Sequence, residues 1–165
     1  MNTASPTTHP HTTVPPLPAA DQHAVVETRL WIEEHVWLYR ILHSADNVSP
    51  TFRLPDLISA SVSLLFSHPD APTRIFRYLC GNLVLRDPQT PRRRESMWRS
   101  QYELLQDLQR SPANRHPNPK FQLDQLTTAC IALCREEDES GNNILRQARI
   151  NMAERTQHGQ ASSSG

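Results

Sequence analysis

The sequence is short of glycine, of cysteine and of net charge, and each shortage excludes something. It has 4 Gly and 3 Cys in 165 residues, and 17 basic residues balance 17 acidic ones. With so few glycines there is no glycine-rich phosphate loop and no nucleophile elbow, and no metal-ligand cluster stands at a recognisable spacing. We therefore expect a protein that is not an enzyme and needs no cofactor or metal. The balanced charge also excludes any argument for a nucleic-acid partner from bulk electrostatics alone.

Long apolar runs are absent as well. No stretch approaches the roughly 20 residues that a membrane-spanning helix needs, so we expect no membrane partner. Cys80, Cys130 and Cys134 are odd in number and sit within apolar patterns, which favours a reduced, cytoplasmic protein over a disulfide scaffold. Residues 1–22 are rich in Pro, Thr and His, and residues 156–165 in small polar side chains, so both read as disordered tails.

What the sequence does contain is a repeat. The segment Ser49–Leu64 matches Asn118–Leu133 in register, with Pro, Phe, Ala and three Leu at corresponding places. The offset of about 69 residues is too long for a solenoid, whose repeats are shorter and more numerous. We therefore predict one domain over residues 23–155, built from two copies (23–88 and 92–155) that pack about a pseudo-twofold axis.

Each copy is predicted to be mainly helical. Upstream of the match, Leu30-Trp31 aligns with Met97-Trp98, and the apolar residues that follow recur at helical spacing. In each copy this predicts a long helix that includes the aligned tryptophan, Trp31 or Trp98. A short strand and two further helices are predicted to follow it. The fold class is thus mainly α, an internal duplication of a helix–short strand–helix–helix unit. The buried stripe of the middle helices is expected to contain Leu57, Leu64, Leu126 and Leu133.

The two short segments Thr51–Leu54 and Lys120–Leu123 raise the functional question, because polar and apolar residues alternate in both. Paired with each other, they would form one two-stranded antiparallel ribbon, which fits the DNA major groove. Its outward face would carry four base-reading residues: Thr51, Arg53, Lys120 and Gln122. The alternation is equally compatible with loops whose apolar residues plug a helical bundle, and both readings stay open.

Two short motifs resemble the ribbon-helix-helix family of DNA-binding proteins. Arg53-Leu54-Pro55 is similar to the end of that family's strand, and Gly141-Asn142-Asn143 is similar to the loop between its helices. The resemblance implies phosphate contacts at the start of the last helix of each copy, at Thr73, Arg74, Asn142 and Asn143. Tandem single-chain members occur among the relaxosome proteins of F-type conjugation, and this chain is similar to them in plan.

One further basic feature is the run Arg92-Arg93-Arg94. It predicts phosphate contacts at Arg92 and Arg93, or else simply a solvated charged face. We expect sequence-selective binding of double-stranded DNA, as a transcriptional regulator or as an accessory protein of plasmid or conjugative-element maintenance. The alternative is an all-helical protein-protein interaction module with no nucleic-acid role. The sequence leaves homo-oligomerisation open.

Overall fold

The computed structural model describes residues 24–114 and 120–163. This part of the chain is mainly helical, with one two-stranded antiparallel sheet, as the sequence predicts. The elements in chain order are β1 (Val25–Trp31), α1 (Ile32–Leu42), α2 (Leu54–Phe66), α3 (Ala71–Gly81), the short 3-10 helix η2 (Leu83–Leu85), β2 (Arg92–Trp98), α4 (Arg99–Arg110), α5 (Leu123–Glu137) and α6 (Asn142–Ser163). The order strand–helix–helix–helix therefore occurs twice, interrupted only by η2.

The strands lie upstream of where the sequence predicts them. Leu30-Trp31 and Met97-Trp98 end β1 and β2, so their assignment to long helices is wrong, and α1 and α4 begin at the next residue. At such a junction the side-chain period changes from 2 to 3.6 within a few residues. Two adjacent apolar residues can share one face of a helix but point to opposite faces of a strand, which is why the helical pattern could be extended backwards through them.

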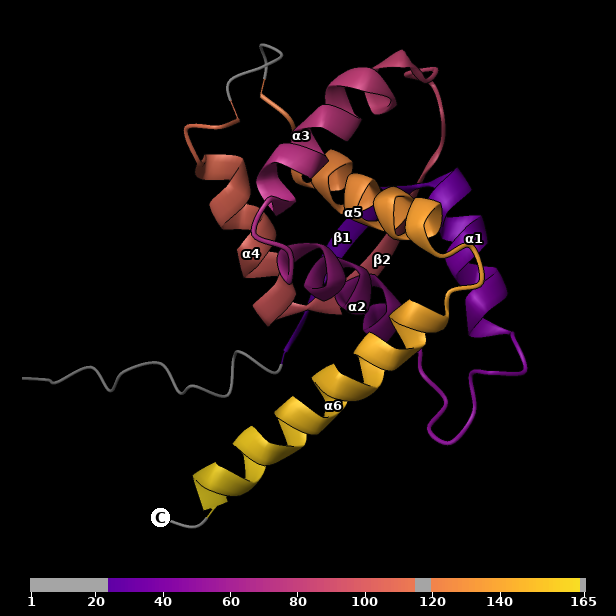
Figure 1. The fold of residues 1–165 in the computed structure, drawn as a ribbon, viewed down its shortest axis with the longest axis vertical. Helices are drawn as coiled ribbons and strands as arrows, with labels where there is room; N and C mark the ends of the chain where they lie inside the picture. The colour runs from indigo at the N-terminus through magenta and orange to yellow at the C-terminus, as the bar shows by residue number, and fades with distance from the viewer. Residues whose placement is uncertain (1–23, 115–119, 164–165) are drawn as a thin grey trace, which may run out of the picture.

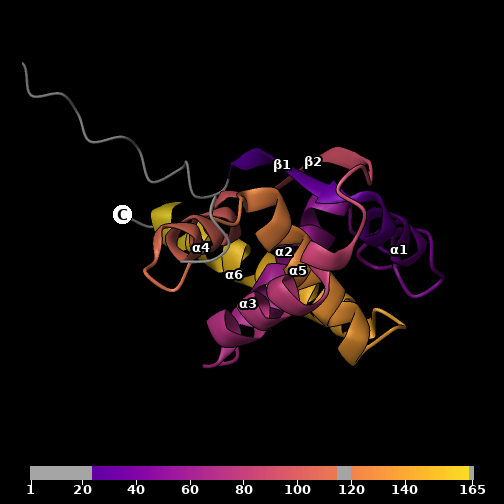
Figure 2. The ribbon, with the colours of Figure 1, turned by 90° about the horizontal axis from the view of Figure 1, so that it is seen from above.

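The two strands form a ribbon that covers the central helices on one side. Thr28 lies opposite Glu95 at the middle of the ribbon, and Val25 lies opposite Trp98 at one end. Viewed from above, the ribbon makes the outermost layer, with α2 and α5 beneath it and α3 farther away (Figure 2). Helices α1 and α4 continue from opposite ends of the ribbon and flank it on either side (Figure 2).

The two halves of the chain interlock. Strand β1 packs on α5, and β2 packs on α2, so each strand rests on the middle helix of the other half. The last helix of each half also packs on the middle helix of the other half: α6 packs on α2, and α3 packs on α5 (Figure 1). Leu57 on α2 and Leu126 on α5 are fully buried, as predicted. Leu133 is buried too, whereas Leu64 is only partly covered.

The segments Thr51–Leu54 and Lys120–Leu123 do not pair with each other, and that prediction is wrong. Each is a loop that runs into the first residue of α2 or α5. The buried side-chain amide of Asn47 accepts the N–H of Phe52 at 2.7 Å and donates to its carbonyl at 3.0 Å. Because one amide side chain satisfies both backbone groups, the loop needs no neighbouring strand. Asn114 makes the same two bonds to Phe121.

At the chain ends, α6 continues to Ser163 and so includes most of the segment that the sequence assigns to a tail. The predicted tail at 1–22 lies outside the described residues. Among the residues that are described, no helix combines the length and the apolar character that crossing a bilayer requires.

Candidate nucleic-acid interface

The outer face of the ribbon is identified by what its inner face touches. The Thr28 hydroxyl is buried and lies 3.2 Å from the hydroxyl of Thr127 on α5, so Thr28 faces the helices. Successive residues of a strand point to opposite faces. The side chains on the solvent side are therefore those of Val25, Glu27, Arg29, Arg94 and Ser96.

This outer face carries mixed charge with an excess of arginine. Arg29 lies directly opposite Arg94, and Glu27 takes up part of that positive charge by an ion pair with Arg94 at 3.2 Å. Arg29 is exposed and has no ion-pair partner within the described residues. Arg93 is also exposed, but it lies opposite Leu30 and so belongs to the other face, where it lines a groove beside α1. On the outer face, Arg29 is thus available to an external ligand.

Arg92, by contrast, is held by the protein itself. Its guanidinium donates to the carbonyls of Pro88 and Thr90, lies 3.7 Å from a carboxylate oxygen of Asp124, and stacks 4.1 Å from the ring centroid of Trp31. The three arginines of the basic run therefore differ in their surroundings. Arg92 links the start of β2 to α5, whereas Arg93 and Arg94 are exposed.

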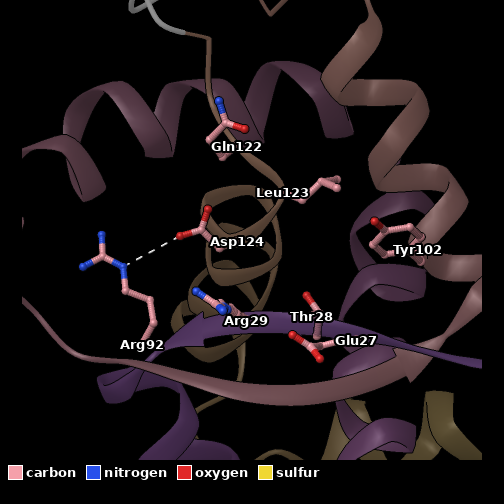
Figure 3. Close-up of a pocket in the computed structure, with 8 residues that line it drawn as sticks. All are labelled: Glu27, Thr28, Arg29, Arg92, Tyr102, Gln122, Leu123 and Asp124. Atoms are coloured by element: carbon pink, nitrogen blue, oxygen red, sulfur yellow. Dashed lines mark ion pairs between the residues drawn. The ribbon is translucent and has the colours of Figure 1, made fainter.

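The first turns of α2 and α5 lie at opposite ends of the ribbon. The backbone N–H of Trp31 donates to Thr128 of α5 at 3.1 Å, and that of Trp98 donates to Ser59 of α2 at 2.8 Å. Beside the first turn of α5, a hollow of about 490 Å³ opens between this helix and the ribbon (Figure 3). Its lining combines ribbon residues with residues of α4 and α5: Glu27, Thr28, Arg29, Arg92, Tyr102, Gln122, Leu123 and Asp124.

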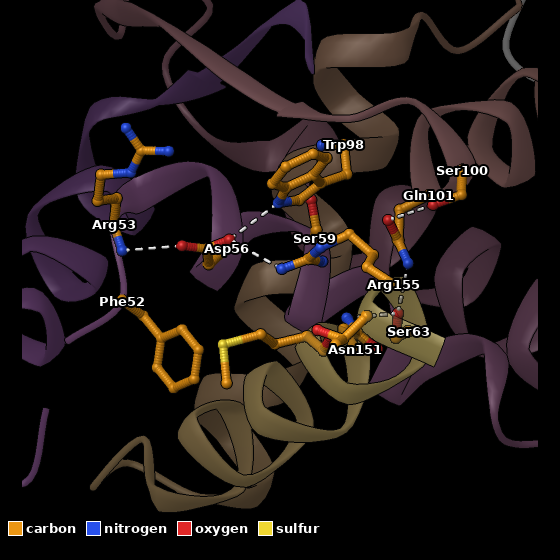
Figure 4. Close-up of polar contacts among 12 residues, drawn as sticks. Phe52, Arg53, Asp56, Ser59, Ser63, Trp98, Ser100, Gln101, Asn151 and Arg155 are labelled. Atoms are coloured by element: carbon orange, nitrogen blue, oxygen red, sulfur yellow. Dashed lines mark hydrogen bonds and ion pairs between the residues drawn. The ribbon is translucent and has the colours of Figure 1, made fainter. Parts of the chain in front are cut away.

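The first turn of α2 is fixed by a polar cluster around Asp56 (Figure 4). This carboxylate accepts the indole N–H of Trp98 at 2.9 Å and the backbone N–H of Arg53 at 3.0 Å, and lies 3.4 Å from Arg155. Arg155 stacks 4.1 Å from the centroid of the Trp98 ring. Burial lowers the pKa of Arg155, while Asp56 partly opposes that shift.

The four predicted base contacts are not on the ribbon. Arg53 and Gln122 precede α2 and α5 at the N-cap position, with Thr51 and Lys120 just upstream, and all four are exposed. Without strands at these positions, the geometric reason for assigning base contacts to them is gone. Nevertheless, they stand in the loops that lead into the two helices at the ends of the ribbon.

Three of the predicted phosphate contacts on the last helix of each half, Arg74, Asn142 and Asn143, have other partners. Thr73 and Arg74 lie in the first turn of α3, where Arg74 forms an ion pair with Glu137.

At the start of α6, the N–H of Asn143 donates to Asp138 at 2.8 Å, and that of Asn142 to the Ser140 hydroxyl at 3.3 Å. Hydrogen bonds, first of all from Ser140, hold the pKa of Asp138 below its usual range. A carboxylate thus occupies the position that the prediction gives to a phosphate.

Sequence reasoning missed Glu27, Arg29, Arg94 and Ser96. A signal for two of them exists in the sequence: the charged Glu27 and Arg29 alternate with Val26, Thr28 and Leu30, which is the period of a strand. The described residues hold no cluster of three or more His, Cys, Asp or Glu side chains that could bind a metal. Cys130 and Cys134 are buried, and desolvation raises the pKa of the Cys130 thiol to about 12.

Comparisons of the chain with protein-family models, with curated proteins and with solved structures return no match. The geometry of the chain is therefore the basis on which its function must be argued.

Proposed function

We propose that this protein binds double-stranded DNA sequence-selectively by inserting the outer face of the β1–β2 ribbon into the major groove. The observation that carries the proposal is an antiparallel ribbon with one face on helices and the other exposed. A two-stranded ribbon has the width of the major groove, where each base pair offers a distinct pattern of donors and acceptors.

The base-reading residues of this proposal are Arg29 and Arg94, with Ser96 and Glu27 beside them. Arginine matches the two acceptors on the major-groove edge of guanine, serine bonds to several bases, and a carboxylate accepts from cytosine. Arg29 and Arg94 lie directly opposite each other near the centre of the ribbon, where a groove-bound ribbon reaches deepest. Their adjacent positive charges also favour an anionic partner over solvent.

Phosphate contacts are proposed at the two ends of the ribbon. The loops that enter α2 and α5 carry the exposed cations Arg53 and Lys120. Their position beside the ribbon suits the walls of a groove better than its floor, so we reassign them from base to phosphate contact. In this proposal the strand and two helices of the ribbon-helix-helix plan are β1–α1–α2 in the first half and β2–α4–α5 in the second. The strand of each unit therefore lies one helix upstream of the segment in which the sequence predicts it.

We further propose that the chain is an internal duplication. Corresponding contacts in the two halves support this: Asn47 with Phe52 matches Asn114 with Phe121, and the Trp31–Thr128 bond matches Trp98–Ser59.

The proposed duplication makes Thr28 and Glu95, which face each other, corresponding residues, so the symmetry axis passes between them. On the outer face Glu27 then corresponds to Arg94, and Arg29 to Ser96. Because the two halves of the ribbon present different side chains, we expect a target whose half-sites differ.

The test is selection of bound duplexes from a random pool, followed by titration of the selected duplex. We expect one sequence class to be enriched. Arg29→Ala and Arg94→Ala should each weaken binding to it about 5- to 150-fold, equivalent to about 1–3 kcal/mol, with little effect on random DNA.

Arg53→Ala should weaken binding to both DNAs alike and reduce the salt dependence. Arg77→Ala is the matched control, since this exposed arginine is on α3, away from the ribbon (Figure 2). If no sequence is enriched and Arg29→Ala binds as the parent does, the proposal is wrong.

A protein-protein interaction module is the second candidate. The all-helical form of that alternative does not fit the ribbon, but an apolar groove on α1 favours a protein partner. The DNA selection separates the two candidates, because an interaction module without a nucleic-acid role enriches no duplex.

A further inference from the structure

Helix α1 and strand β2 enclose a groove of about 610 Å³ that faces away from the core. Its apolar surface comes from one side of α1, where Ile32, Val36 and Tyr39 recur at helical spacing. Val36 is 44% exposed and Tyr39 is 48% exposed, although both are large enough to gain from burial. No described segment of the chain covers this side of α1.

The rim of the groove is cationic. Arg40 and Arg93 line it and are exposed, and neither forms an ion pair with a described residue. The acidic side chain in the groove, Glu95, is already engaged by His35 at 2.8 Å. An occupant must therefore bring apolar surface for the floor and negative charge for the two arginines.

Helix α4 carries such a surface at the other end of the ribbon. Leu104 is 37% exposed, and the exposed carboxylates of Glu103 and Asp107 stand one turn apart beside it. Neither carboxylate has an ion-pair partner among the described residues. In the proposed duplication, Glu103 and Asp107 correspond to Val36 and Arg40, so the two flanking helices differ where they face solvent.

We infer that the α1 groove binds the outer side of α4 from a second copy of this chain. The apolar floor then covers Leu104, and the rim arginines meet Glu103 and Asp107. Because α1 and α4 lie at opposite ends of the ribbon (Figure 2), the contact is heterologous. Each bound copy still offers a free groove or a free helix, and the assembly extends head to tail instead of closing as a twofold dimer.

The experiment measures the mass of the full chain in solution by sedimentation, without DNA, up to about 1 mM, the range of weak association. The wild-type chain should rise above its monomer mass of 18.8 kDa and pass beyond the dimer as concentration increases. Val36→Glu should remain a monomer because it blocks the groove, and Asp107→Arg should remain a monomer because it repels Arg40.

Mixing provides the sharper test. Val36→Glu retains an intact α4, and Asp107→Arg retains an intact groove, so an equimolar mixture should form a dimer and nothing larger. The double variant Arg40→Asp with Asp107→Arg exchanges the charges within the contact and should recover assembly. Val84→Glu, at a half-exposed position after α3, is the control and should assemble as the wild type does.

A wild-type chain that is monomeric throughout overturns the inference. So does a mixture of the two variants that stays monomeric, or an Asp107→Arg chain that assembles normally. Far-ultraviolet circular dichroism should show each variant folded, since all the substituted side chains are exposed. None of these measurements depends on DNA, so they succeed or fail independently of the proposed function.

Discussion

The two halves of the chain agree in their interior and differ on their surface. Inside, a buried asparagine braces the loop before each middle helix, and a hydroxyl on each middle helix receives the N–H of a strand-ending tryptophan. Outside, α1 presents an apolar groove with a cationic rim, whereas α4 presents two carboxylates. Packing constrains the interior of both halves in the same way, while their exposed side chains are free to differ.

The largest effect should come from the matched core. Leu57→Ala on α2 and Leu126→Ala on α5 each open a cavity at fully buried positions, and each should cost about 2–5 kcal/mol of unfolding free energy. Because the halves interlock, we expect the two costs to agree closely and a single cooperative transition in each case. Urea denaturation followed by circular dichroism measures both.

Leu85→Ala is the control for this pair, because that side chain is 77% exposed and its loss should cost under about 0.5 kcal/mol. Costs for Leu57 and Leu126 that differ by more than about 2 kcal/mol would show that the halves are not equivalent even in the core.

A second comparison concerns the bracing asparagines. Asn47→Ala and Asn114→Ala each leave a buried N–H and carbonyl without a partner, so each should cost about 2 kcal/mol. The exposed Asn82, at the end of α3, provides the control by the same substitution. A near-zero effect at Asn114 alone would mean that the second loop is held by other contacts.

Much of this interior could be predicted from the sequence, whereas the ribbon has a weaker signal. The repeat of Phe-x-Leu before each middle helix is directly visible, and Phe52 and Phe121 are buried as that pattern indicates. The sequence does not predict the asparagines that hold these loops, because they belong to irregular segments of unequal length that have no periodic pattern of apolar residues. The strands were missed because β2 begins with three arginines, which look like a solvated run until the opposite strand is known.

The third prediction addresses a difference within a matched pair. The indole N–H of Trp98 donates to Asp56, whereas that of Trp31 is buried with no acceptor among the described residues. Trp98→Phe and Trp31→Phe remove similar apolar surface, but only the first also removes a hydrogen bond to the partly buried carboxylate of Asp56, which keeps the Arg53 N–H and Arg155 as partners. We expect Trp98→Phe to cost about 1 kcal/mol more, as measured by thermal or urea unfolding. Equal costs would mean that the Asp56 contact contributes nothing net.

The smallest effect separates the N-termini of the two last helices. Asp138 accepts the N–H of Asn143 at the start of α6, while Asp70, before α3, makes no capping bond with its side chain. Asp138→Ala should therefore cost about 0.5 kcal/mol at pH 7, at the low end for a lost cap, because the site is near the surface. Asp70→Ala should cost almost nothing.

The Asp138 contribution should also depend on pH with a defined sign. Its pKa is lowered in the folded protein, chiefly by the Ser140 hydroxyl, so folding favours the ionised form. The stabilisation is then complete above the unfolded-state pKa of about 3.9 and is lost as pH falls through the lower folded-state value. Urea midpoints of Asp138→Ala and the parent should differ at pH 7 and converge toward pH 3, while Asp70→Ala follows the parent throughout. If the difference in urea midpoint persists unchanged at pH 3, the effect comes from the backbone preference of residue 138 and not from the charge of its carboxylate.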